Sequence, residues 1–299
     1  MAVLVVGSVA LDTIETPDDR REDVLGGSAT HFSIASSYFG DVQLVGVVGD
    51  DFPDSGFRLF KDHGIDTAGL RQVEGKTFRW SGRYFENPNK RETLSTDLNV
   101  FEQFSPEIPE AYRSSRFLFL ANIHPALQLE VLSQVTDPEL VVTDTMNLWI
   151  DTALDELTEV IAQSDILIVN DEEVKQLTGQ SNLFHASKSL LERGPDYIIA
   201  KKGEHGAMMV GENECFYAPA YPVDEVIDPT GAGDSFAGGL LGYLDQIGRW
   251  NARELRKAII YGSTMASFDV EAFSVEQLQE LTRKDIETRY QEFGEMTRF

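Results

Sequence analysis

The most informative stretch of this sequence lies in its last third and runs Asp228-Pro229-Thr230-Gly231-Ala232-Gly233-Asp234-Ser235-Phe236-Ala237-Gly238-Gly239. It follows a strand-like segment, Val223 to Ile227, and leads into an apolar segment typical of a helix, Ala232 to Leu244. Two glycines around an alanine let the backbone turn tightly into a helix start. Peptide N–H groups are free there and the helix dipole is positive, so the stretch predicts an anion site built from the amides of Gly231, Ala232 and Gly233.

A carboxylate, Asp234, directly follows these amides. A negative group beside an anion site is costly unless it has a task there. Phosphoryl transfer supplies one, because the amides neutralise the developing charge while Asp234 accepts the proton of the attacking hydroxyl. The alternative is an ordinary helix cap, since Asp is common near helix starts. We expect Asp234 to be a catalytic base.

Upstream of this stretch, short apolar runs alternate with helical segments. The runs are typical of buried strands in a parallel sheet, and they are Val3 to Gly7, Val42 to Val48, Phe117 to Ala121, Leu140 to Thr143, Ile166 to Val169 and Tyr197 to Ala200. Helices are expected at Ala29 to Phe39, Asp151 to Ala162, Asp171 to Leu177 and Leu183 to Arg193. This alternation predicts an α/β fold with a mainly parallel sheet covered on both faces.

The remaining segments include two that break the alternation. Residues 11–25 are polar, and residues 73–104 are rich in β-formers and aromatics, with turn residues at Asn87-Pro88-Asn89. We expect a small antiparallel β lid from these two segments, within a single domain over residues 1–299; a long hairpin without function is the alternative. Downstream, helices are expected at Ala252 to Phe268 and Val275 to Leu281, and the charged tail from about Lys284 is expected to pack loosely.

Taken together, these features resemble the ribokinase-like (PfkB) carbohydrate kinase family over nearly the whole chain. The family's C-terminal signature matches residues 228–239, and its N-terminal signature matches Gly26-Gly27-Ser28-Ala29-Thr30-His31-Phe32-Ser33-Ile34-Ala35. The resemblance implies a ribokinase-like three-layer sandwich, ATP and Mg²⁺ as cofactors, and a sugar or nucleoside as substrate. One position departs from the pattern, because the family usually has Asn where this chain has His31, so substrate preference does not follow from the resemblance.

The resemblance also assigns roles to residues outside the two signatures. For the substrate, it implies Asp12, with Gly26, Gly27 and His31. Independently of the resemblance, Asn99, Asn122 and Asp144 follow lid or sheet strands and are candidates to line the same cleft, because ligands of such sheets bind beyond the strand ends. For the nucleotide, it implies Asn170 near the phosphates, the turn formed by Lys202, Gly203 and Gly206, and Ser263 at the adenine. For metals, it implies Glu173 in the Mg²⁺ shell through water, and Asp228 and Thr230 at a possible K⁺ site. Each has a structural alternative, such as a helix cap for Asn170 and Glu173 or a plain hairpin turn for Gly203.

The composition limits the partners of this protein. The chain has 50 acidic and 25 basic residues, a formal charge of −25, and such a surface repels nucleic acid and anionic membranes. This acidity serves solubility or reflects a salt-rich cytoplasm, where salt screens the repulsion. No apolar run reaches membrane-spanning length and no signal peptide is evident, so a cytoplasmic location is expected. The single cysteine, Cys215, is expected in a strand as a small buried hydrophobe.

The functional hypothesis is therefore an ATP-dependent phosphotransferase acting on a hydroxyl of a sugar or nucleoside. Aromatic lid residues at 78, 80, 84 and 85 could stack on a base or form the lid core, and basic residues at 79, 83, 90 and 91 could bind a phosphorylated sugar or pair with nearby acids. The alternative function is a non-catalytic nucleotide or sugar sensor on the same fold. A homodimer formed through the lid strands is compatible with either function.

Overall fold

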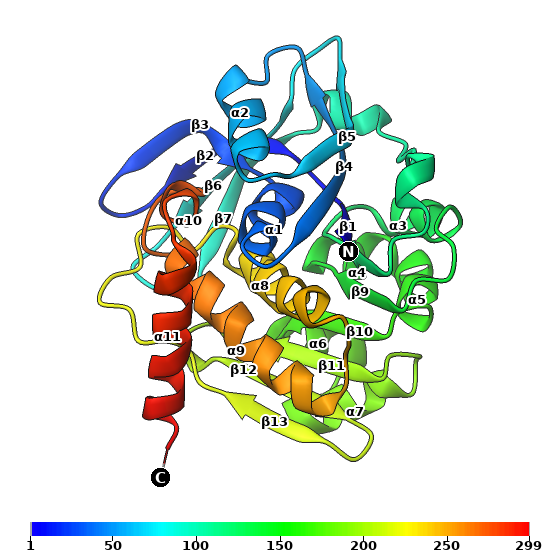
Figure 1. Cartoon of the computed structure of the whole chain (residues 1–299), viewed down its shortest axis with the longest axis vertical. Coiled ribbons are helices and arrows are strands. Elements are labelled where there is room, and N and C mark those ends of the chain that lie inside the picture. Colours follow the sequence, from blue (N-terminus) through cyan, green and yellow to red (C-terminus); the bar gives the residue numbers. More distant parts are fainter. Residues whose placement is uncertain (1, 299) are drawn as a thin grey trace.

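The structure, a computed structural model, describes residues 2–298. Its main sheet has nine strands in the order β13-β12-β11-β10-β9-β8-β1-β4-β5 (Figure 1). The strands from β11 to β5 in this order pair in parallel, and β12 and β13 extend the sheet antiparallel at one edge. Their bounds are β1 (Ala2–Val6), β4 (Asp41–Gly49), β5 (Asp66–Val73), β8 (Phe117–Leu120), β9 (Leu140–Asp144), β10 (Ile166–Asn170), β11 (Tyr197–Lys201), β12 (Ala207–Gly211) and β13 (Cys215–Ala218).

Helices cover both faces of this sheet and complete a three-layer sandwich. Successive side chains of a strand point to opposite faces, so Val5 of β1 packs in one buried cluster with α1, α8 and α9, whereas Leu4 packs in another with α3 and α5. The helices are α1 (Ser28–Ser37), α2 (Asp54–Asp62), α3 (Pro125–Leu132), α4 (Asn147–Thr152), α5 (Leu154–Ala162), α6 (Asp171–Thr178), α7 (Leu183–Leu191), α8 (Ala232–Ile247), α9 (Ala252–Asp269), α10 (Glu276–Gln279) and α11 (Arg283–Met296). Among residues 2–298, every helix falls short of what crossing a bilayer requires.

A second, four-stranded sheet lies at one side of the molecule, at the left in Figure 1, in the order β3-β2-β6-β7. Its strands are β2 (Ala10–Glu15), β3 (Arg20–Gly26), β6 (Phe78–Tyr84) and β7 (Arg91–Asp97), which fall within the two segments expected to form a lid, apart from single residues at 10 and 26. The two hairpins are antiparallel, as expected, but β2 and β6 pair in parallel. The reason is connectivity: β2 follows β1 and β6 follows β5, and β1 and β5 point in the same direction in the main sheet.

Two expectations about regular structure are wrong. Residues 223–227 form no strand, because the backbone there is held by the loop after α9, with the amide of Ile227 donating to the carbonyl of Val270 at 2.8 Å. The helix expected over residues 151–162 is two helices, α4 and α5, that meet at Ala153, whose φ of −145° is not helical.

Two further expectations fail because the packing partners lie far away in the sequence. The tail does not pack loosely: it forms α11, which buries Ile286 and Phe293 and stacks the ring of Tyr290 on Tyr261 of α9 with centroids 4.1 Å apart. Cys215 does lie in a strand, but it is exposed. Its strand, β13, is the last of the sheet, where side chains are less covered than in a central strand.

Candidate active site

The carboxyl ends of three neighbouring strands bring three polar side chains to one edge of the main sheet. Asp144 ends β9, Asn170 ends β10 and Lys201 ends β11, and Asn170 is level with Lys201 in the parallel pairing of β10 and β11. Lys201 Nζ lies 3.2 Å from Asp144 Oδ2. Ligands of open parallel sheets bind beyond this edge, so it is the natural place for a binding site.

Helix α8 begins beside these strand ends. A Cβ placed on Gly233 would lie 2.8 Å from Lys201 Nζ, so the first turn of α8 and the ammonium are neighbours. The helix starts from Gly231, whose φ of 83° favours glycine. Within residues 2–298, the N–H groups of Gly231 and Gly233 have no backbone acceptor, and that of Ala232 reaches only the carbonyl of Pro229 at 3.4 Å. Free amides are therefore present where the sequence predicts an anion site.

Asp234 lies in the first turn of α8 and is half-buried. The helix is capped by Gly231, and the Asp234 carboxylate makes no hydrogen bond to any part of the chain that the structure describes, so the ordinary capping role does not account for it. Burial, and next the carboxylate of Asp144, raise the pKa of Asp234 to about 7, against the opposing effect of His31 and Lys201. A carboxylate with a pKa near neutrality and no bonded partner is well suited to accept a proton.

Lys201 is the residue of this site that the sequence analysis missed. The expectation fell on its neighbour Lys202, whose Nζ lies 5.8 Å from the ring centre of Tyr217 in β13. Adjacent side chains at a strand end point in opposite directions, so Lys201 turns toward α8 when Lys202 turns away from it. The signal was available, because Lys201 is the first polar residue after the apolar run at 197–200 and ligands bind beyond strand ends.

His31 lies directly beneath the start of α8. A Cβ on Gly231 would be 2.1 Å from His31 Nδ1, so the ring fills the space that glycine leaves. His31 Nδ1 is 2.9 Å from Asp269 Oδ1, which also accepts from the Ser235 hydroxyl at 3.1 Å. Burial lowers the pKa of His31, but Asp269 and other carboxylates outweigh it and raise the pKa to about 9. The ring is therefore a buried cation under the predicted anion site, and its expected role toward substrate stays a prediction.

Asp12 and the glycine pair lie close to His31. Asp12 is buried in β2, and its Oδ2 would lie 1.9 Å from a Cβ on Gly26, so only glycine leaves room for the carboxylate. Gly27 caps α1, and its carbonyl accepts from the amide of His31 at 3.3 Å. Asp12 Oδ1 has no partner within residues 2–298, and burial raises the pKa of Asp12 to about 7 although His31 lowers it. This free oxygen is available to a hydroxyl donor.

Asp228 and Thr230 hold the loop that precedes α8. The Asp228 carboxylate accepts from the amide of Thr230 at 2.8 Å and from the amide of Ser274 at 3.0 Å. The Thr230 hydroxyl donates to the hydroxyl of Tyr84 in the lid strand β6 at 3.1 Å. These bonds connect the loop to both the lid and the C-terminal region. Each carboxylate oxygen keeps a second lone pair, which a K⁺ ion would use. The possible K⁺ site at Asp228 and Thr230 stays a prediction.

Asn170 and Glu173 form the capping box of α6. The amide of Glu173 donates to Asn170 Oδ1 and the amide of Asn170 donates to Glu173 Oε2, both at 2.8 Å. The helix cap, which is the structural alternative for both residues, is therefore present. It engages Glu173 Oε2, so Glu173 Oε1 is available to another partner. Burial is the main cause that raises the pKa of Glu173 to about 7. Within residues 2–298 no group of three or more His, Cys, Asp or Glu side chains is arranged to hold a metal. The role of Glu173 toward Mg²⁺ stays a prediction.

The glycine turn after β11 lies under the tip of the lid. Gly203 begins a 3₁₀ turn, Gly203–His205, that ends at Gly206 with a φ of 84°. The hairpin between β6 and β7 reaches this turn, where Asn89 Nδ2 donates to Glu204 Oε2. Ser263, expected at the adenine, is buried in α9. The nucleotide-binding roles of Lys202, Gly203, Gly206 and Ser263 stay predictions.

Two further candidates, Asn99 and Asn122, form hydrogen bonds with residues outside the site described so far. Asn99 is exposed, has a φ of 50° and donates to the carbonyl of Thr77 at 3.0 Å. Asn122 follows β8, and its Oδ1 accepts from Trp149 Nε1 at 2.8 Å. His124, two residues further, caps α3 by accepting from the amide of Ala126. These side chains have structural partners, and the binding roles of Asn99 and Asn122 stay predictions.

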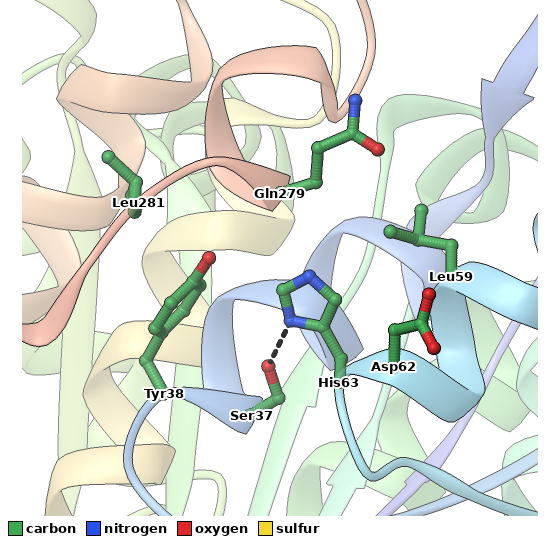
Figure 2. Close-up of a pocket in the computed structure, with 7 residues that line it drawn as sticks. All are labelled: Ser37, Tyr38, Leu59, Asp62, His63, Gln279 and Leu281. Atoms are coloured by element: carbon green, nitrogen blue, oxygen red, sulfur yellow. Dashed lines mark hydrogen bonds between the residues drawn. The ribbon is translucent and has the colours of Figure 1, made fainter.

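The molecule also has a hollow away from this site, shown in Figure 2. It encloses about 530 Å³ between the end of α1, the end of α2 and the α10 region. His63 Nδ1 lies 3.0 Å from the Ser37 hydroxyl, which donates to the carbonyl of Ile34 at 2.7 Å. Because the serine proton is engaged by the backbone, the pair does not form an activated nucleophile. Helix α1 separates this hollow from Gly27 by roughly 15 Å, the length of ten helical residues.

Comparison with known proteins identifies the family to which this chain belongs. The chain is 29% identical to a cytidine kinase of Thermococcus kodakarensis over 245 residues, 80% of this chain and 87% of that protein. It is 28% identical to an aminoimidazole riboside kinase of Salmonella typhimurium over 287 residues, 90% and 89% of the two chains. A structure of a putative Ribokinase II from E. coli in complex with ATP and Mg²⁺ superposes with a TM-score of 0.79 at 20% identity, covering 97% of this chain and 99% of that one. Residues 2–280 match the family described as pfkB family carbohydrate kinase, and the chain therefore belongs to that family.

Proposed function

We propose that this protein is an ATP-dependent kinase that phosphorylates a hydroxyl group of a ribonucleoside or sugar. The observation that carries the proposal is the start of α8, where free backbone amides at Gly231 and Gly233 lie beside Asp234, a carboxylate without a hydrogen-bonded partner among residues 2–298. Amides at a helix start stabilise the charge of a phosphoryl group in flight. A binding protein of the sensor type would have no use for a free carboxylate at that point.

In the proposed reaction, the acceptor hydroxyl oxygen bonds to the γ-phosphorus as the bond from that phosphorus to the ADP oxygen breaks. The hydroxyl proton passes to Asp234, which must therefore be ionised beforehand. The amides of Gly231, Ala232 and Gly233 hold the phosphoryl oxygens. Mg²⁺, when bound, would offset phosphate charge, and Glu173 would orient it through water.

The substrate side of the site is assigned to Asp12, Gly26, Gly27 and His31. Asp12 offers a buried, unpartnered oxygen, and one carboxylate accepts two hydrogen bonds from neighbouring hydroxyls of a ribose or sugar. The lid would exclude water from these groups and so limit wasteful hydrolysis of ATP. Asn99 and Asn122 remain candidates for the outer part of the same cleft.

Between nucleosides and sugars, a nucleoside is the preferred substrate class. The relatives named above act on cytidine and on aminoimidazole riboside, both of which carry a base or base-like ring on ribose. The lid itself adds little support, because Phe78 packs against Phe101 and the Tyr84 hydroxyl is bonded to Thr230. Trp80 packs against the cluster of Ile14, Tyr84 and Phe273 and donates from its indole N–H to the Thr93 hydroxyl at 3.3 Å. The exposed Phe85 is therefore the lid aromatic best placed to meet a base.

A phosphorylated sugar is a weaker candidate because two of the four basic lid residues, Arg79 and Arg83, have acidic partners. Arg79 pairs with Asp23 at 3.0 Å and with Asp51 at 2.8 Å, and Arg83 pairs with Glu15 at 2.9 Å. Two guanidinium groups engaged in this way are not free to receive a substrate phosphate.

A homodimer through the lid is proposed as the assembly. Strand β7 is the edge of the lid sheet, and all its residues are exposed on both faces. An edge strand of this kind offers unpaired backbone groups to a second copy. Sedimentation or sizing in salt, compared with a variant that carries Leu94→Lys in β7, would test it, since a monomeric wild-type protein contradicts the assembly.

The kinase proposal is tested by measuring ADP release with a panel of ribonucleosides, sugars and sugar phosphates, with and without high KCl. The control is ADP release without acceptor. Acceptor-dependent release that is greatest with a nucleoside supports the proposal, and stimulation by KCl supports the K⁺ site. ATP binding without transfer to any acceptor would favour the sensor instead.

A further inference from the structure

We infer that Lys201 is a further catalytic residue, whose ammonium group contacts the phosphoryl group being transferred beside the amides of α8. This inference rests on the proposed kinase function and adds a cation to its anion site. The structure, unlike the sequence, distinguishes Lys201 from its neighbour Lys202, because it places Lys201 beside α8.

The position of Lys201 supports this role. Its side chain extends from the carboxyl end of β11 to the first turn of α8, where a Cβ on Gly233 would lie 2.8 Å from Nζ. A Cβ at this distance would displace the end of the lysine side chain, so the ammonium lies directly beside the first turn of α8. The side chain is 20% exposed, whereas its partner Asp144 is 6% exposed. The Lys201 side chain is therefore paired with Asp144 and still partly accessible from solvent.

The charges around Lys201 also support a contact between its ammonium group and a phosphate. Three carboxyl groups, of Asp144, Glu173 and Asp234, lie within electrostatic reach of the ammonium. One ammonium does not balance three carboxylates, and phosphates would be repelled from such a place unless cations met them. Burial lowers the pKa of Lys201, but Asp144 and Glu173 outweigh it and raise the pKa, so the group stays charged. A lysine ammonium binds phosphate oxygens as a compact point charge.

A purely structural ion pair between Lys201 and Asp144 is the competing explanation, and nucleotide binding separates the two. ATP carries the β- and γ-phosphates that would reach the ammonium, and AMP does not. A cation that contacts these phosphates contributes to ATP binding alone, whereas a structural pair affects both nucleotides through the shape of the site.

The experiment compares ATP and AMP affinity by calorimetry in the wild type, Lys201→Met and Lys257→Met. The control lysine forms an ion pair of similar length, with Nζ 3.0 Å from Glu254 Oε2 on α9. Loss of a charge-assisted hydrogen bond predicts ATP binding about 10- to 150-fold weaker in Lys201→Met, with AMP binding unchanged. Lys257→Met should bind both nucleotides as the wild type does, and Lys201→Arg should recover part of the ATP affinity.

The result that overturns the inference is Lys201→Met binding ATP like the wild type, or losing ATP and AMP affinity equally. This binding test needs no acceptor, so it separates the inference from the proposed function. If the wild type binds ATP but phosphorylates nothing, the kinase proposal fails on its own, and if it binds no ATP, both fail. With a working acceptor, Lys201→Met should also lower kcat and shift the acid limb of the pH profile upward, because its charge lowers the pKa of Asp234.

Discussion

Replacing Gly231 with Ala tests the contact between the start of α8 and the His31 ring. The new Cβ would lie 2.1 Å from His31 Nδ1, whereas ordinary contacts begin at 3.4 Å, so the ring must move by more than 1 Å. That movement would strain the 2.9 Å bond from His31 to Asp269 inside the core. The φ of 83° costs roughly 1–2 kcal/mol for an L-residue, and overpacking costs a further 1–3 kcal/mol or so. The unfolding free energy should fall by roughly 2–5 kcal/mol in all.

The matched control is Gly64→Ala, because Gly64 has a φ of 67° but no atom of residues 2–298 within 4 Å of the added Cβ. It should lose only the backbone part, roughly 1–2 kcal/mol. Urea unfolding followed by tryptophan fluorescence gives both values. If the two variants lose the same free energy, the His31 ring does not lie against Gly231, and the account of a buried cation under the anion site is refuted. A larger loss in Gly231→Ala, together with reduced ATP binding, supports it.

Three further predictions concern the site and the surface. The kcat/KM value should rise as pH increases through about 7, because Asp234 must lose its proton to act as a base and burial raises its pKa to that value; a flat profile between pH 6 and 8 contradicts this. Glu173→Gln should keep the stability of α6, since Gln also completes a capping box, but should raise the Mg²⁺ concentration for half-maximal activity about 10- to 100-fold; an unchanged Mg²⁺ requirement argues against the outer-shell role. Cys215 should react with a thiol reagent in the native protein because it is exposed, and reaction only after unfolding would place it in the core.

The sequence was informative where one local pattern determines local structure. The glycines at 231 and 233 predicted the start of α8, and the apolar runs predicted the strands that position Asp144 and Asn170. The capping box of α6 involves neighbours three residues apart, so its two members were also within reach of a local pattern.

The misses depend on contacts between distant parts of the chain. His31 is paired with Asp269, which is 238 positions away, so the sequence around His31 does not predict this partner. The choice between Lys201 and Lys202 depends on which residue ends β11 facing α8, a difference of one position that reverses the direction of the side chain. Helix α11 packs on α9, where the ring of Tyr290 stacks on Tyr261. The local sequence of the tail does not indicate this partner.

The central claim is that Asp234 removes the proton of the acceptor hydroxyl at the start of α8. The most direct measurement is the single-turnover rate of phosphoryl transfer by Asp234→Asn, with the acceptor that gives the wild type its highest turnover, together with the calorimetric Kd for ATP. The account predicts a rate about 10²- to 10⁴-fold lower, the usual contribution of a general base, with ATP binding retained. A transfer rate close to that of the wild type would contradict it.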